Sequence, residues 1–237
     1  MYERAYFPMK ILNLSQGYGA GTSTHVYSYA LDFCGKDSGR DDVYAPFDCK
    51  VTKKYVKSGH SFEVWLTSTK KVLARNGYYG YLTMSITHPS EIASMKVGQK
   101  FKQGELICRE GKEGATANHI HLELSEGTKA GWDIIKGNYV NKNKVKPEEY
   151  LFLPESSVIK KEKYKGVKYH FAKESEITKR ISSKDGLNIH KTMDFNKKST
   201  IAEFKYNDDV ILLRTKGDYA LVYRMGILGW CSKKYLK

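Results

Sequence analysis

A short run at residues 118–124, Asn-His-Ile-His-Leu-Glu-Leu, holds the side chains best suited to chemistry. In a β-strand successive side chains point to opposite faces, so His119, His121 and Glu123 would share one face. Neutral imidazole is a good zinc ligand, and two histidines on one strand face are a common way to build a metal site. The alternative is a strand with two surface histidines, and so short a motif does not decide between the two by itself.

A glycine-rich segment upstream, residues 17–24, leads into His25, and Asp32 follows seven residues later. Together with one histidine of the pair, these residues would form a set of two imidazoles and one carboxylate. Three protein ligands with an open fourth position are typical of catalytic zinc, whereas structural sites more often close with four ligands, many of them cysteines. The residue types and their order therefore indicate a catalytic metal site.

The elements that must position these residues have the pattern of short β-strands. Residues 50–56, 62–67 and 81–87 alternate in polarity or are rich in β-branched and aromatic residues, and clusters of Gly, Asn or Ser bound them. No long segment up to residue 150 shows helical periodicity, so we predict an all-β fold.

A change of character at residues 154–177 divides the chain. A Pro-Glu-Ser-Ser cluster and a lysine-rich run predict a linker there. Short strands resume at residue 178, and the last 60 residues fit a small β-barrel. We therefore predict a β-rich domain at residues 1–153, a linker at 154–177 and a smaller β-domain at 178–237.

Composition narrows the class of protein. The 237 residues carry a net charge of +14, and most of the excess of lysine and arginine lies in the last third of the chain. Such a field favours a polyanionic partner such as nucleic acid, anionic lipid or an anionic wall polymer, and charge alone does not choose among them. The four cysteines have no C-x-x-C spacing, so we interpret them as packing residues: Cys34, Cys49, Cys108 and Cys231.

Several of these motifs, taken in order, resemble the lysostaphin-type (LytM-like) zinc metallopeptidases, which cut peptidoglycan cross-links. The segment from His25 to Asp32 resembles the place of that family's first His and Asp. Residues 118–123 are close to its H-L-H-F-E motif, 97–105 resemble its glycine turn, and 111–114 resemble its G-x-x-G. The resemblance covers roughly residues 8–126, and it implies a zinc endopeptidase with a β-rich fold.

The resemblance also implies a role for individual residues. His25, Asp32 and His121 match the zinc ligands, and His88 and His119 match the two catalytic histidines. These two would share the general acid/base and oxyanion-stabilising roles, and the sequence does not say which does which. Two departures are a longer gap between His25 and Asp32 and a proline directly after His88.

Two further residues near the motifs, Tyr18 and Glu123, each have two interpretations. Tyr18 either adds a hydroxyl donor to the site or packs as an aromatic residue. Glu123 either orients a ligand histidine or is a solvated carboxylate. His60, His170 and His190 have no comparable context, and we interpret them as surface residues.

The C-terminal segment resembles a bacterial SH3-type cell-wall-binding domain. Residues 186–190 resemble the L-N-V-R opening of that domain, with His190 in place of the arginine, and residues 228–236 resemble its G-W-V-x-x-x-Y-L close. The resemblance implies a wall-binding module, with the aromatic residues Trp230, Tyr219 and Tyr223 as candidates for recognition.

The predicted protein is a modular endolysin of phage or prophage type. We expect a monomer that binds Zn2+, peptidoglycan and anionic wall polymers, and neither nucleic acid nor membrane. The amino-terminal residues lack the pattern of a signal peptide, so we expect synthesis in the cytoplasm and action on the bacterial wall after release. One alternative is a non-catalytic LytM-like protein that binds the wall or regulates an amidase. A nucleic-acid-binding protein is the other, and no recognition helix or RNA-binding motif supports it.

Overall fold

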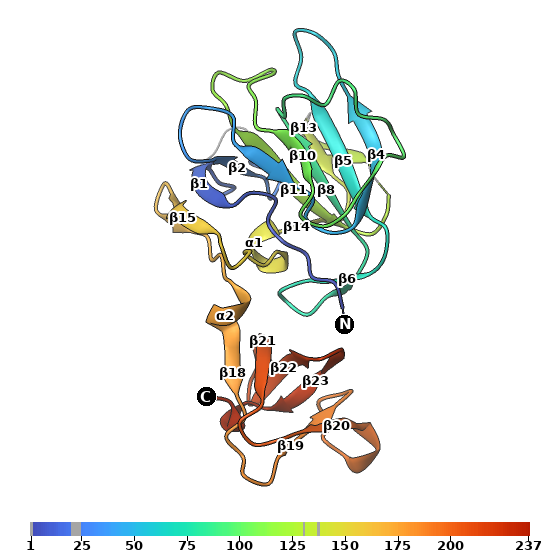
Figure 1. Cartoon of the computed structure of the whole chain (residues 1–237), viewed down its shortest axis with the longest axis vertical. Coiled ribbons are helices and arrows are strands. Elements are labelled where there is room, and N and C mark those ends of the chain that lie inside the picture. The colour runs from blue at the N-terminus through green and yellow to red at the C-terminus, as the bar shows by residue number, and fades with distance from the viewer. Residues whose placement is uncertain (1, 20–24, 130, 137) are drawn as a thin grey trace.

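The computed structural model describes residues 2–19, 25–129, 131–136 and 138–237, and its fold is all-β, as predicted. Strands dominate these residues, and the two α-helices among them have four residues each. Two units follow one another along the chain, a larger one at the top of Figure 1 and a smaller one below it. No helix in the described part is long and apolar enough to cross a membrane.

The larger unit is built on a sheet to which nine strands of the described chain contribute. These strands pair antiparallel, except that β1 and β15 run parallel. In spatial order the sheet consists of β15 (Val158–Lys161), β1 (Ile11–Gln16), β2 (Leu31–Cys34), β11 (Ile120–Glu126), β8 (Leu82–Thr87), β5 (Glu63–Ser68), β4 (Cys49–Tyr55) and β9 (Lys100–Phe101), with β14 (Lys144–Val145) paired to β11.

The two faces of this sheet differ in chemistry because side chains alternate along each strand. His121 and Glu123 of β11 lie on one face, and the register continues this face to the neighbouring strands. Asp32 of β2 is opposite His121 on one side, and Thr87 of β8 is opposite it on the other. The other face of β11 is fully buried in the core and consists of Ile120, Leu122 and Leu124.

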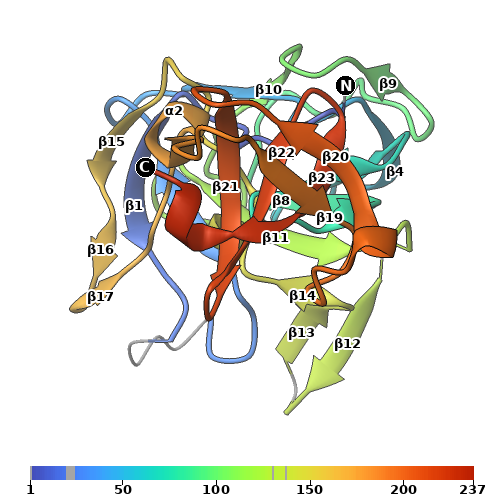
Figure 2. The same cartoon turned by 90° about the horizontal axis from the view of Figure 1, so that it is seen from below.

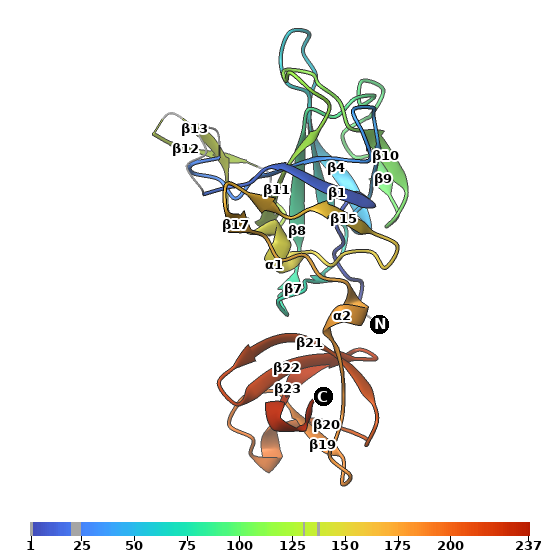
Figure 3. The same ribbon diagram turned by 90° about the vertical axis from the view of Figure 1, so that its left-hand side faces the viewer.

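Small two-stranded sheets flank the main one within the described residues. They are β3 (Asp42–Tyr44) with β10 (Leu106–Arg109), β6 (Val72–Leu73) with β7 (Tyr79–Gly80), β12 (Trp132–Ile135) with β13 (Asn138–Asn141), and β16 (Lys163–Tyr164) with β17 (Val167–Lys168). The β12–β13 hairpin projects sideways from the larger unit in Figure 3. Asn141 fastens its base to the main sheet, because its Nδ2 donates to Ser85 Oγ at 2.7 Å. Helix α1 (Pro147–Tyr150) follows, with proline at its first turn, where no backbone donor is lost.

The smaller unit is a six-stranded antiparallel sheet with a core of its own, as far as the described residues go. Its strands in spatial order are β18 (Thr178–Arg180), β21 (Asp209–Lys216), β22 (Tyr219–Arg224), β23 (Ile227–Ser232), β19 (Leu187–His190) and β20 (Thr200–Phe204). Figure 2 views this sheet from below, with β21 and β22 in front of the larger unit. Two short 3-10 helices, η1 (Lys197–Ser199) and η2 (Lys233–Tyr235), complete it. Cys231 is fully buried in this core, and all four cysteines are free, which agrees with their interpretation as packing residues.

Residues 154–177 differ from the linker that we expected, because they form secondary structure on the larger unit. β15 extends the main sheet, and α2 (Glu174–Ile177) precedes the smaller unit. Tyr169 and Phe171 are buried in the larger core, where the Phe171 ring lies edge-on to Phe7 at 5.2 Å between centroids. Two isolated aromatic residues in a lysine-rich segment give no periodic pattern, so the sequence did not reveal this packing.

An apolar cluster joins the two units. It contains Leu73 and Phe152 of the larger unit together with Ile211, Leu213, Leu221 and Tyr223 of the smaller one. The Tyr2 ring stacks on Tyr223 with centroids 5.5 Å apart, and the Tyr2 backbone N–H donates to the Tyr223 hydroxyl. Gly77 next to this cluster has φ +87°, a backbone conformation that favours glycine, and its Cα faces the side chain of Leu221. Tyr223 is 1% exposed, so the expectation that it recognises a wall ligand is wrong.

The packing of residues 154–177 can be tested with Phe171→Ala. We expect this change to lower the free energy of unfolding by about 3 kcal/mol, because it leaves a cavity in the larger core. Val167→Ala, at an exposed position of β17, is the matched control and should change it by less than about 0.5 kcal/mol. Denaturant unfolding followed by circular dichroism measures both. Equal stability of the two variants would mean that this segment does not belong to the folded larger unit.

Candidate metal centre

Two adjacent strands and the segment before one of them bring the three ligand-type residues together. Asp32 of β2 is the register partner of His121 on β11, and His25 precedes β2. One ligand atom from each residue lies within 4.8 Å of the others. The two imidazole rings meet edge-to-face at 4.8 Å between centroids. The structure thus brings His25, Asp32 and His121 to one point on the polar face of the main sheet.

The geometry of this cluster fits a zinc ion. His121 Nδ1 lies 3.0 Å from Asp32 Oδ1, and His25 Nε2 lies 3.4 Å from Asp32 Oδ2. Asp32 Oδ1 is buried and has no well-formed hydrogen bond among the described residues, and such an atom calls for a partner. Burial alone raises the pKa of Asp32, but the contacts from His121 and His25 outweigh it and hold that pKa well below its usual range. Two imidazoles and one carboxylate that stays ionised form a donor set that zinc prefers.

Glu123 contacts His121 through the ring nitrogen that does not face Asp32. Its Oε1 lies 3.1 Å from His121 Nε2, and its Oε2 accepts the backbone N–H of Asn141 at 3.4 Å. Glu123 is 8% exposed, so it is not the solvated carboxylate of the second interpretation. When Nε2–H of His121 donates to Glu123, the lone pair remains on Nδ1, on the side of Asp32. Glu123 therefore selects the tautomer of His121 that can bind a metal.

The other two predicted histidines lie beside the cluster. The rings of His88 and His119 have centroids 4.7 Å apart, and His88 lies 6.4 Å from His121 by the same measure. The Nδ1 of His88 lies 2.8 Å from the carbonyl of Glu113, and the Nδ1 of His119 lies 2.9 Å from that of Ala117. When Nδ1–H of each ring donates to its carbonyl, the free lone pair of that ring is on Nε2. The Nε2 atom of His119 lies 4.0 Å from Asp32 Oδ2.

Two glycines of the G-x-x-G motif allow the loops that carry these histidines to come close. A Cβ at Gly111 would lie 2.7 Å from the carbonyl oxygen of His88. Gly114 has φ +78°, and a Cβ there would lie 2.6 Å from the backbone nitrogen of Ser61. Gly111 also accepts the backbone N–H of His119 at 2.9 Å. The motif thus acts by close backbone packing, which only glycine permits here.

A groove of about 710 Å³ opens beside the metal centre. Its lining residues are Tyr55, His60, Ser61, Glu63, Thr87, His88, His121, Glu123, Trp132 and Tyr139. Glu63, Trp132 and Tyr139 were not among the predicted site residues, and His60 is exposed, as expected, but lines the groove. Alternation along residues 62–67 could have indicated the face of Glu63, whereas nothing local indicates that the β12–β13 hairpin forms a wall of the groove.

The remaining candidates lie elsewhere. Tyr18 donates its hydroxyl to Glu148 and packs edge-on against Tyr29 at 5.1 Å, so it is a packing residue. His170 is exposed, as expected. The expectation for His190 is wrong, since it is 6% exposed and its ring stacks on Phe195 at 4.5 Å. Of the glycine-rich segment 17–24, residues 20–24 lie outside the described part of the chain.

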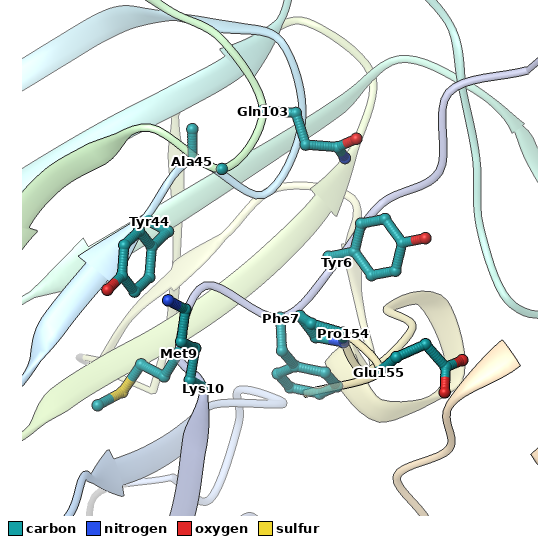
Figure 4. A pocket seen from close by; sticks show the side chains of 10 residues that line it. Tyr6, Phe7, Met9, Lys10, Tyr44, Ala45, Gln103, Pro154 and Glu155 are labelled. Carbon is teal, nitrogen blue, oxygen red and sulfur yellow. The ribbon is translucent and has the colours of Figure 1, made fainter. Parts of the chain in front are cut away.

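A second cavity, of about 310 Å³, has a different chemistry. Figure 4 shows it between the first residues of the chain and Pro154, with the Tyr6 and Tyr44 rings on opposite sides. The residues that line it are mostly apolar and include no histidine: Tyr6, Phe7, Met9, Lys10, Tyr44, Ala45, Gln103, Gly104, Pro154 and Glu155. It offers no acid/base pair and no ligand set, so the groove beside the histidines is the candidate site.

Part of the chain is similar in sequence to a curated protein. A curated protein, "Morphogenesis protein 1" of Bacillus phage B103, is 38% identical over 130 residues, which is 54% of this chain. The matched region is 34% of that protein, so the chain spans about a third of the length of its relative. No family model matches the chain.

Solved structures with limited similarity include proteins described as peptidases. A zinc-containing peptidase from Vibrio cholerae is 19% identical, with a TM-score of 0.39 over 59% of this chain and 39% of that one. The catalytic domain of lysostaphin from Staphylococcus simulans is 21% identical, with a TM-score of 0.35 over 54% of this chain and 84% of that one. A solution structure of lysostaphin is 15% identical, with a TM-score of 0.41 over 96% of this chain and 92% of that one.

The protonation of His121 leads to a prediction about pH. Burial alone lowers the pKa of His121, but the close contacts with the carboxylates of Asp32 and Glu123 outweigh burial and raise it. Without metal the ring therefore holds its extra proton at neutral pH, and a metal ion must displace that proton. We expect the apparent zinc affinity to fall about tenfold per unit as the pH is lowered from about 8 to 6.

Competition with a chromophoric chelator measures this affinity at each pH. Glu123→Gln is the matched variant, because loss of the carboxylate lowers the pKa of His121 and shifts the fall in affinity to lower pH. An affinity that does not depend on pH would contradict the assignment of His121 as a ligand.

Proposed function

We propose that this chain is a zinc endopeptidase that hydrolyses a peptide bond in the stem or cross-bridge of bacterial peptidoglycan. One observation carries the proposal: three ligand-type side chains cluster beside two further imidazoles, and two of these five residues, His88 and His121, line one groove. A site with only three protein ligands keeps a position open, which is typical of catalytic rather than structural zinc. The choice of peptidoglycan rests on the sequence resemblance to lysostaphin-type enzymes.

The chemistry would be divided between the metal and the two free imidazoles. When bound by His25, Asp32 and His121, zinc supplies a Lewis acid that polarises a carbonyl and acidifies a water. Neutral His88 or His119 can accept a proton from the attacking water at Nε2 and return it to the amine that leaves when the C–N bond breaks. The other ring, once protonated, can donate from Nε2 to the oxygen that gains negative charge. Burial lowers the pKa of His88, which keeps this ring neutral at neutral pH.

We also propose that the smaller unit binds the cell wall. The excess of lysine and arginine in the last third of the chain fits an anionic wall polymer. Sedimentation of the full chain with purified walls, across a salt series, tests this role. Binding by charge weakens as salt screens exposed groups, whereas recognition by aromatic residues such as Trp230 or Tyr219 persists. Absence of binding at every salt concentration would refute the role.

Hydrolysis itself is tested on purified walls. We expect turbidity to fall, and mass spectrometry of the released muropeptides to reveal one type of new amino terminus. A chelator should stop the reaction, and added zinc should restore it. The non-catalytic alternative predicts binding to the wall with no released peptides, so the two functions give opposite results.

The biological role that we propose is that of a phage endolysin, released at lysis. The relative in a Bacillus phage supports a phage context. Because that relative is named for morphogenesis, a role as a component of the phage particle is a second candidate. Immunodetection in purified particles and in the soluble lysate separates the two, since an endolysin is found only in the lysate.

A further inference from the structure

The polar face of the main sheet continues past the metal centre as the floor of the groove. His121 on β11 is the register partner of Thr87 on β8, and Thr87 is in turn the partner of Glu63 on β5. Tyr55 on β4 continues the row. Adjacent strands lie about 4.8 Å apart, so the backbone of Glu63 lies about 10 Å from that of the ligand-type residue His121.

Glu63 is a half-buried carboxylate that can accept further hydrogen bonds. Its Oε1 accepts the indole N–H of Trp65 at 2.6 Å. It forms no ion pair within the described part of the chain, and it is a lining residue of the groove. Burial raises the pKa of Glu63, and the hydrogen bond from Trp65 and the charge of Lys53 compensate only in part. A cationic group that enters the groove would stabilise the ionised form of this carboxylate.

Lys53, whose charge acts on Glu63, forms no ion pair with it among the described residues and contacts two tryptophan rings. Lys53 Nζ lies over the face of Trp132 and 5.2 Å from the ring centroid of Trp65. Trp132 meets Trp65 edge-on at 5.5 Å and Tyr139 at 6.0 Å, so these rings form one aromatic wall. Lys53 thus fastens the β12–β13 hairpin to the sheet, and the groove combines an aromatic wall with an acidic floor.

We infer that Glu63 anchors a primary ammonium group of the substrate, so that the groove selects peptides with a diamino acid near the scissile bond over oligoglycine. The inference rests on the proposed endopeptidase function and names its substrate class. A charge-assisted hydrogen bond to Glu63 would hold the ammonium, and the aromatic wall would cover its methylene stem. An extended chain advances about 3.3 Å per residue, so a side chain one or two residues from the cut bond can span the distance to Glu63.

Matched soluble peptides test the charge separately from the shape. One carries a lysine near the scissile bond, one carries the same lysine acetylated, one carries diaminopimelate, and one carries glycine there. We expect kcat/KM to be about tenfold higher for the ammonium peptides than for the acetylated peptide, mainly through KM, because the contact is present before and during the reaction. Comparison of the lysine peptide with the diaminopimelate peptide shows which of the two side chains the groove prefers.

Glu63→Gln is the decisive variant, since it keeps the acceptor for Trp65 and removes only the charge. The preference for ammonium over acetylated peptide should fall to about onefold, with the zinc content unchanged. Glu203→Gln, an exposed position in the smaller unit, is the control and should keep the tenfold preference. A preference that survives in Glu63→Gln would overturn the inference.

Direct binding separates a failure of this inference from a failure of the proposed function. In a His119→Ala background, calorimetry with the same peptides needs no turnover. Tighter binding of the ammonium peptides that is lost on Glu63→Gln supports the anchor even if no peptide is cleaved by the parent protein. Equal binding of all four peptides overturns the anchor even if the parent cleaves them.

Discussion

His121→Ala is expected to remove zinc and peptidase activity together while both units stay folded. His121 is one of the three ligand-type side chains that form the cluster in the described part of the chain, and its Nδ1 lies 3.0 Å from Asp32 Oδ1. Loss of one ligand from a three-ligand site leaves two, too few to hold zinc against water. Elemental analysis of the purified variant and hydrolysis of purified walls measure the two effects.

A second histidine variant controls for the loss of an imidazole as such. His170 is exposed and lies outside the groove, so His170→Ala should keep both the metal and the activity. Full zinc content in His121→Ala would show that the ion is held elsewhere, and the assignment of His25, Asp32 and His121 would then be wrong.

His88→Ala and His119→Ala should keep zinc and lose about 10²- to 10⁴-fold in kcat, the usual effect of a positioned acid or base. Both rings lie beside the metal cluster, with Nδ1 on a main-chain carbonyl and Nε2 available for a proton. Hydrolysis of a soluble cross-bridge peptide gives kcat, and elemental analysis of the same samples gives the zinc content.

Zinc content decides the role of His119 in particular. Its Nε2 lies 4.0 Å from Asp32 Oδ2, near enough for a small movement to make it a ligand. If His119→Ala loses its zinc, this residue belongs to the ligand set and not to the acid/base pair. If His88→Ala cleaves at the parent rate, the assignment of His88 as a catalytic histidine is refuted.

Local order along the chain was enough to find the histidines that the structure brings together. The alternation of a β-strand is set within a few residues, so His119, His121 and Glu123 could be assigned to one face and Leu122 to the other. The all-β class was also readable, because short alternating segments bounded by turn residues need no tertiary information.

Other features depend on contacts between residues that are distant in sequence. The burial of Phe171 and His190, and the contact of Tyr223 with the other unit, follow from packing that leaves no periodic trace in the chain. A lysine-rich segment was therefore expected to be a linker, although part of it is buried, and Tyr223 was expected to be available to a ligand.

The groove itself could only be seen in the folded chain. Glu63 is 58 residues from His121 in sequence. In the sheet, however, both residues are register partners of Thr87, which lies on the strand between them. Trp132 also lines the groove, and it belongs to the hairpin that follows β11 in the chain. Strand register and the packing of loops are set by the free energy of the whole sheet, whereas the face of a residue within its strand is set by backbone geometry alone. For this reason the sequence sufficed to pick out the candidate ligands, and the substrate groove beside them emerged only with the tertiary structure.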